Sequence, residues 1–205
     1  MLELICDKEQ SLKIFTENNY AQGSFFWFPL LKAKEIKVNG VRVSKDVRLK
    51  KGDKVSYYTT QKQENKPAFY EVYKDENFLI VDKESGVNSE AVFAALSRRQ
   101  ECYFIHRLDR NTKGLLTFAL TKSAEAALVQ AFKTKNVEKK YYALCLGSFS
   151  CDREVLNAYL KKDNEKALVK LYDTQVQGSE KIITEYQVLE KRETETKVEV
   201  TLHTG

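Results

Sequence analysis

The segment I-K-V-N-G-V-R-V, residues 36–43, restricts the folding of this chain more than any other local feature. Branched and charged residues alternate on both sides of Asn39-Gly40, a pair that readily adopts the positive φ angles of a two-residue turn. Because successive side chains of a strand point to opposite faces, the pattern predicts a β-hairpin. Its valines are expected on one face, and Lys37 and Arg42 on the other.

Two short helices are expected before the hairpin, over residues 11–19 and 24–34, and a closing strand after it, over residues 52–58. The second helix is rich in aromatic residues, at positions 25–28, and Pro29 limits its regularity. We expect these aromatic side chains to pack in the core or between domains rather than to stack on nucleic-acid bases.

The stretch T-T-Q-K-Q-E-N-K-P, residues 59–67, is polar and has no apolar periodicity, which is typical of a linker. The sequence therefore predicts a small domain over residues 1–60, a linker over residues 61–69 and a larger domain over residues 70–205.

Positive charge is concentrated in one part of the small domain. Residues 32–54 contain nine basic and three acidic residues, a net charge of +6, whereas the whole chain carries +5. The rest of the chain is therefore close to neutral. A local basic patch of this kind is typical of a surface that binds a polyanion.

The larger domain is predicted to combine several strands with fewer helices. Strands are expected over residues 78–82, 115–121, 139–146, 182–189 and 197–202, and helices over residues 90–98 and after Ser123 as N-cap. The second helix has an apolar stripe formed by Ala124, Ala127, Leu128, Ala131 and Phe132. Because strands outnumber helices and many connections are short, the predicted fold class is α+β with a mainly antiparallel sheet.

The cysteine and apolar patterns exclude several other classes. Four cysteines without a C-x-x-C pair and only two histidines argue against a zinc site. The N-terminal ten residues carry charges where a signal peptide needs an apolar core. No apolar run approaches the roughly 20 residues of a membrane span. We expect a cytoplasmic protein with free thiols, no metal and no membrane partner.

The segment H-R-L-D-R-N-T-K-G-L-L, residues 106–116, places Asp109 between Arg107 and Arg110, directly before an apolar run. Neighbouring guanidinium groups favour the charged form of a carboxyl group, and arginines can also hold the phosphates of a substrate. The pattern therefore indicates chemistry at a nucleic acid. The alternative is a surface strand with an ordinary ion pair.

This segment resembles the signature H-R-L-D-x-x-T-S-G-L-L of the RluA-type pseudouridine synthases, with Lys113 where serine is usual. Residues 73–83 resemble the first strand of that family's catalytic domain, although K-E-S-G replaces its K-P-x-G. K-K-Y-Y-A, residues 139–143, resembles its K-x-Y-x-A motif, and L-H-T-G at residues 202–205 resembles the opening of its L-x-T-G motif. These matches occur in the family's order.

The small domain is similar to the RNA-binding domain named after ribosomal protein S-four, whose basic hairpin has the form I-x-V-N-G-x-x-V. Here aromatic residues occupy positions of the second helix that often hold Ser and Arg. RNA binding is therefore assigned mainly to Lys32, Lys34, Lys37 and Arg42. The alternative is an ordinary solvated lysine face.

The resemblance also implies roles in the reaction. Asp109 would be the catalytic carboxylate, acting on the sugar or the base, and Tyr141 would stack on the uracil. Arg107 would fill the space left by the flipped base, or alternatively clamp a phosphate or form an ion pair. His106 is expected to be a packed, hydrogen-bonded imidazole.

The implied reaction has no redox step and imports no group, so no cofactor and no metal are expected. The expected partner is structured RNA, with 23S rRNA favoured over tRNA, and the chain is expected to be a monomer.

The family's third motif continues past L-x-T-G with a basic residue and T-H-Q-I-R, and its basic side chains are expected to pair with the catalytic aspartate. Nothing follows Gly205 here. The resemblance therefore predicts a truncated protein whose catalytic domain is incomplete. The alternative function is an RNA-binding protein without catalysis, and a third possibility is an unrelated α+β protein with chance motif matches.

Overall fold

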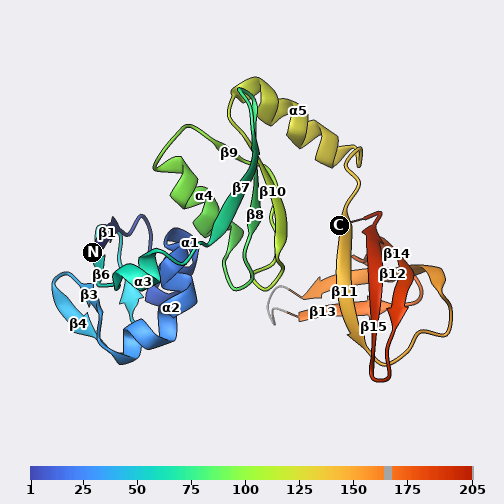
Figure 1. Ribbon diagram of the computed structural model, residues 1–205, viewed down its shortest axis with the longest axis horizontal. Coiled ribbons are helices and arrows are strands. Elements are labelled where there is room, and N and C mark those ends of the chain that lie inside the picture. The colour runs from blue at the N-terminus through green and yellow to red at the C-terminus, as the bar shows by residue number, and fades with distance from the viewer. Residues whose placement is uncertain (164–167, 205) are drawn as a thin grey trace. The chain divides into compact units, whose positions relative to one another are not determined.

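The computed structural model describes residues 1–163 and 168–204. They form two compact units, Met1–Val129 and Gln130–Gly205, which are described separately below (Figure 1). Every strand pairing among the described residues is antiparallel, and helices are few, so the predicted α+β class is confirmed. The predicted domain boundaries at residues 60 and 70 stay predictions.

The first unit begins with a four-stranded sheet in the order β1 (Leu2–Ile5), β6 (Lys54–Tyr57), β3 (Ile36–Val38) and β4 (Val41–Val43). The β3–β4 pair is the predicted hairpin: φ is 50° at Asn39 and 83° at Gly40, as a tight turn requires. Lys37 lies directly opposite Arg42. A second, two-stranded ladder joins β2 (Gln10–Ser11) to β5 (Arg48–Leu49).

Two helices pack on this sheet, α1 (Leu12–Asn19) and α2 (Ala21–Lys32). Ser11 caps α1, because its hydroxyl oxygen accepts a hydrogen bond from the Ile14 amide at 3.2 Å. The second helix begins three residues before its predicted start and is kinked at Phe26, where φ is −111° and ψ is 16°. The kink lies one turn before Pro29, whose ring crowds the preceding turn of a helix.

The core of this part is closed by side chains from both helices and three strands. Its buried members are Cys6, Leu12, Phe15, Tyr20, Leu30, Ile36, Leu49, Val55 and Tyr57. Burial raises the pKa of the Tyr57 hydroxyl, which lies 2.8 Å from the Thr16 hydroxyl. Phe26 and Trp27 pack against this core as predicted, whereas Phe28 is 71 % exposed and departs from the prediction.

The same unit continues into a second sheet, ordered β7 (Phe69–Lys74), β8 (Phe78–Lys83), β10 (Gly114–Ala119) and β9 (Tyr103–Phe104). A short helix, α3 (Gln61–Glu64), occupies the predicted linker and is closed by a capping box between Thr60 and Gln63. Helix α4 (Ser89–Ser97) packs against α1.

Helix α5 (Lys122–Lys133) follows β10 and crosses the boundary between the units. Its N-cap is Thr121 rather than the predicted Ser123. The Thr121 hydroxyl accepts from the Ala124 amide at 3.2 Å, and the Thr121 carbonyl accepts the first helical bond, from Glu125. No helix among the described residues is long and apolar enough to cross a membrane.

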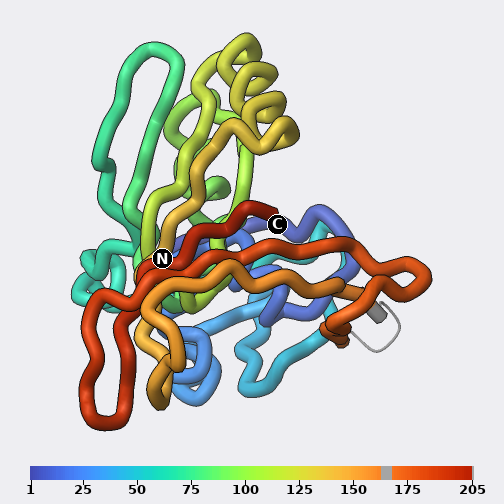
Figure 2. The backbone as a smooth tube through the Cα atoms, turned by 90° about the vertical axis from the view of Figure 1, so that its right-hand side faces the viewer, coloured from blue at the N-terminus to red at the C-terminus, as the bar shows by residue number. Residues whose placement is uncertain are grey.

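The second unit contains one five-stranded sheet in the order β11 (Lys140–Leu146), β15 (Glu195–Leu202), β14 (Glu180–Lys191), β12 (Arg153–Asp163) and β13 (Leu168–Tyr172). Figure 2 follows β14 and β15 as the red end of the chain. Strands β11, β14 and β15 were predicted. Strands β12 and β13 were not predicted, because their apolar residues do not alternate with polar ones.

Candidate active site

Asp109 lies in the loop that joins β9 to β10, and its side chain is exposed. The preceding residue, Leu108, is only 7 % exposed. Ser89, at the start of α4, is fully buried and holds both polar groups of the Leu108 backbone. Its hydroxyl donates to the Leu108 carbonyl at 2.8 Å and accepts from the Leu108 amide at 2.9 Å. The carboxylate therefore projects from a backbone that is fixed directly beside it.

Lys83, the last residue of β8, also holds the backbone of the Asp109 loop. Its side chain is 0 % exposed, and its ammonium donates to the carbonyls of Val87 at 2.8 Å, Glu84 at 3.2 Å and Arg110 at 3.2 Å. Burial lowers the pKa of Lys83, while the negative charges of Asp109 and Glu84 oppose that shift. A buried positive charge thus lies within electrostatic reach of the predicted catalytic carboxylate.

The turn after β8 provides a third support for the loop. The Gly86 amide donates to the Arg110 carbonyl at 2.8 Å, and the Arg110 Nε donates back to the Gly86 carbonyl at 3.1 Å. Gly86 has φ +88°, a left-handed conformation that favours glycine. The Ser85 hydroxyl donates to the Asn111 carbonyl at 2.9 Å. The two loops therefore form one hydrogen-bonded layer.

The two arginines beside Asp109 in the sequence form their ion pairs with other carboxylates. The Arg107 Nη1 lies 3.0 Å from the Glu90 Oε1 of α4, and Arg110 pairs with Glu17 of α1. The Arg107 side chain is 65 % exposed despite this ion pair, and its role toward RNA stays a prediction. The Asp109 carboxylate instead acts on the buried Lys83, where its negative charge opposes the lowering of the Lys83 pKa by burial.

His106 has the packed position that was predicted, since its Nε2 accepts a hydrogen bond from the Thr117 amide at 3.1 Å. The Thr112 amide donates to the Asp109 carbonyl at 3.0 Å and closes the turn after the carboxylate. Lys113 pairs with Glu84 at 2.6 Å, and this hydrogen bond raises the pKa of Lys113.

Tyr141 lies on β11 in the second unit, opposite Val200 of β15, and is half-buried. The next residue, Tyr142, faces the other side of the strand and is 72 % exposed. Asp109 belongs to the first unit. The pairing of Asp109 with Tyr141 therefore stays a prediction.

The predicted RNA-binding residues gather at one end of the N-terminal sheet. The Arg42 guanidinium donates to the Lys34 carbonyl at 2.8 Å, and Lys32 lies in the last turn of α2. Lys37 and Arg42 both lie over the Tyr58 ring, at 4.9 and 5.9 Å from its centroid. We call Lys32, Lys34, Lys37 and Arg42 the basic hairpin patch.

The supporting residues Lys83 and Ser89 were not predicted from the sequence. A signal for Lys83 was present, because the inward positions of β8 are Leu79, Val81 and Lys83, and a lysine at such a position needs buried acceptors. No comparable signal marks Ser89. Among the described residues, no group of three or more His, Cys, Asp or Glu side chains could hold a metal ion.

Comparisons with known proteins identify the family of this chain. Residues 64–205 match the family of RNA pseudouridylate synthases, and the chain belongs to that family. One relative is ribosomal large subunit pseudouridine synthase C of Vibrio cholerae, which is 31 % identical over 204 residues. That match covers 87 % of this chain and 64 % of the relative, so the chain spans less than two thirds of the relative's length.

Two further matches extend the comparison. RNA pseudouridine synthase 1 of Arabidopsis thaliana is 37 % identical over 82 residues, which cover 38 % of this chain and 26 % of that protein. The solved structure of human RNA pseudouridylate synthase domain containing 1 aligns with a TM-score of 0.56 at 25 % identity. It covers 67 % of this chain and 60 % of the human chain.

Proposed function

We propose that this protein is an RNA pseudouridine synthase that isomerises uridine in structured RNA, with Asp109 as the catalytic carboxylate. The observation that carries the proposal is the Asp109 loop, in which an exposed carboxylate projects from a backbone held by Ser89, Lys83 and Gly86. Family membership and the family's signature around Asp109 support the same assignment.

The reaction requires little beyond such a carboxylate. The bond between N1 of uracil and C1′ of ribose breaks, the base rotates, and C5 bonds to C1′. The proton on C5 is lost and N1 gains one, so atoms and electrons balance without a cofactor or a metal. Asp109 either attacks the sugar or base or stabilises the charge that develops there. Tyr141 is proposed to stack on the uracil.

The free energy needed to unstack the target nucleotide indicates which RNA structures are preferred. The target nucleotide must leave its stack, which costs a few kcal/mol and least in a loop or bulge. Arg107 is proposed to fill the space that the flipped base leaves or to bind a nearby phosphate, since its planar cation suits both roles. The basic hairpin patch is proposed to hold phosphates of the same RNA.

Large-subunit rRNA is favoured because several relatives are named ribosomal large subunit pseudouridine synthases. We further propose a cytoplasmic monomer.

The test is a pseudouridine assay on rRNA and tRNA from cells that lack the gene, with the 205-residue chain and its Asp109→Asn variant. The substitution keeps the shape of the side chain and removes its charge. We expect modification by the unchanged protein and a loss of at least about a thousandfold in the variant. Modification that persists in Asp109→Asn rules out Asp109. RNA binding without modification by the unchanged chain favours the binding-only function.

A further inference from the structure

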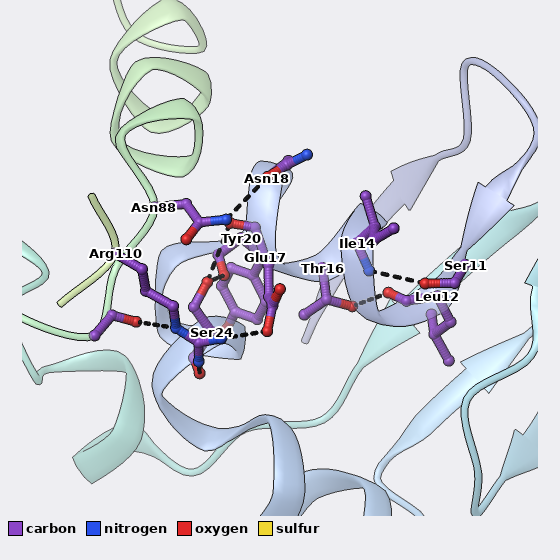
Figure 3. A network of polar contacts seen from close by, with 11 residues as sticks. Ser11, Leu12, Ile14, Thr16, Glu17, Asn18, Tyr20, Ser24, Asn88 and Arg110 are labelled. Carbon is purple, nitrogen blue, oxygen red and sulfur yellow. Dashed lines mark hydrogen bonds and ion pairs between the residues drawn. The ribbon is translucent and has the colours of Figure 1, made fainter. Parts of the chain in front are cut away.

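The Arg110 side chain connects the Asp109 loop to the N-terminal helices (Figure 3). Its Nη1 pairs with the Glu17 carboxylate of α1, and its Nη2 donates to the Ser24 carbonyl of α2 at 3.3 Å. Its Nε donates to the Gly86 carbonyl at 3.1 Å. One guanidinium therefore bonds to α1, to α2 and to the turn after β8, which lies far from both helices in the sequence.

The setting makes these bonds stronger than those of a surface pair. The Glu17 side chain is only 13 % exposed and that of Arg110 is 39 % exposed. Ser24 is 2 % exposed. Charge-assisted hydrogen bonds in such partly dry surroundings contribute more than neutral or solvated ones, and an unpartnered Glu17 carboxylate would be costly.

Two other contacts define where the helices sit on this part of the unit. The Asn88 amide donates to the Asn18 side-chain oxygen at 3.0 Å, and Arg98 donates to the Asn19 carbonyl at 3.2 Å. Asn88 is the N-cap and Arg98 the C-cap of α4, the helix on which α1 packs. Of the residues that make these polar contacts to α1 and α2, Arg110 is the one next to Asp109 in the chain.

We propose that Arg110 is a positioning residue, through which the docking of α1 and α2 sets the position of Asp109. This inference rests on the proposed function of Asp109. The backbone carbonyl of Arg110 is held by Lys83 and Gly86, while its side chain is held by Glu17 and Ser24. A displacement of the helices would therefore pull on the residue that follows the carboxylate.

Helix α2 extends this connection to the basic hairpin patch. Ser24 lies near its beginning and Lys32 in its last turn. The two residues lie on opposite sides of the kink at Phe26. The helix that accepts a hydrogen bond from Arg110 therefore also carries one residue of the basic hairpin patch.

The experiment compares Glu17→Gln, Arg110→Met, Arg110→Lys and the double variant in single-turnover modification of RNA. We expect Glu17→Gln and Arg110→Met each to slow the chemical step about tenfold, with RNA affinity changed less than about twofold. The double variant should be no slower than Arg110→Met, because both substitutions remove the same contact. Arg110→Lys keeps the charge and should recover part of the rate.

The matched control is Glu9→Gln, which removes an exposed Arg–Glu pair of 2.6 Å elsewhere in the N-terminal part and should leave the rate unchanged. Hydrogen exchange is measured on the same proteins. In Glu17→Gln and Arg110→Met, the amides of residues 107–112 should exchange at least about fivefold faster, while those of β8 stay unchanged.

The two proposals fail in different ways. If Asp109→Asn abolishes modification but Glu17→Gln and Arg110→Met match the unchanged protein, the positioning role is wrong and the proposed function stands. If the unchanged chain modifies no RNA, exchange decides: unaltered exchange at residues 107–112 in both variants overturns the role of Arg110, and accelerated exchange confined to them supports it.

Discussion

Leu108 and Asp109 adjoin in the chain but have opposite surroundings, since Leu108 is buried and Asp109 is exposed. The buried Ser89 hydroxyl holds the backbone amide and carbonyl of Leu108 at once. These two hydrogen bonds to the main chain of Leu108 limit the motion of the next residue, Asp109. At this scale the position of the carboxylate depends on a fully buried side chain.

We predict that Ser89→Ala lowers the free energy of unfolding by about 1–3 kcal/mol, because it leaves two buried polar groups of Leu108 without their partner. Chemical denaturation followed by circular dichroism measures the change. The same variant should modify RNA more slowly at unchanged RNA affinity.

The control for this prediction is Ser97→Ala, at the other end of the same helix. Ser97 is exposed, and its hydroxyl lies 3.3 Å from the Cys102 sulfur, a weak partner. Its removal should cost less than about 0.5 kcal/mol. Equal losses in the two variants would contradict the special role of Ser89.

Strand β14 shows how one element of the second unit depends on charge. Glu185 accepts hydrogen bonds from Arg153 of β12 at 2.6 Å, and its other oxygen lies 3.0 Å from Nε2 of His203. The hydrogen bond from Arg153, followed by that to His203, lowers the pKa of Glu185 below its ordinary value of 4.5. The carboxylate therefore links two strands and the residue after β15.

This lowered pKa predicts an acid-sensitive contribution to stability. The folded state favours the ionised carboxyl group, so the contribution is complete above pH 4.5 and is lost as the pH falls through the folded-state pKa. The melting temperature of Glu185→Gln should therefore lie below that of the unchanged protein at neutral pH, and the gap should narrow on acidification. Thermal scans over a pH series measure this, with the exposed Glu193→Gln as control. A gap independent of pH would contradict the prediction.

The elements that could be predicted from sequence are those whose signals are local. The β3–β4 hairpin follows from Asn39-Gly40 and the alternation around it. Strands β12 and β13 depend on pairing with each other and with β14, and much of both strands is exposed. A strand without one clearly buried face has no alternating pattern to find.

The candidate site was predictable to the same extent. Asp109 is marked by the residues around it, whereas Lys83 and Ser89 act on main-chain groups that only the folded chain brings to them. The neighbouring arginines were expected to hold Asp109 in its ionised form, but their carboxylate partners come from α1 and α4. Tertiary partners of this kind leave no mark in the adjacent sequence.

At the scale of the whole molecule, the basic hairpin patch lies in the N-terminal part and Asp109 lies in the loop before β10. Both belong to the first unit. Under the proposed function, an RNA held at the patch would be bound by the same unit that contains Asp109. The affinity for that RNA should be largely electrostatic.

We predict that RNA affinity falls steeply as salt rises, because bound phosphates release their counterions. Lys37→Gln and Arg42→Gln should each lower the slope of log affinity against log salt by about 1. Fluorescence anisotropy across a salt series measures both effects. Lys135→Gln, in the second unit, is the control; the same slope in all proteins would remove the patch from RNA binding.

The order of strands in the five-stranded sheet of the second unit has a consequence for synthesis on the ribosome. Strand β11 pairs with β15, so its hydrogen-bonding partner is translated about 50 residues later. At about 5–20 residues per second, the nascent β11 waits several seconds with its edge unpaired. Until β15 is made, the unpaired backbone groups of β11, together with its exposed Leu144 and Leu146, leave the strand open to non-native association.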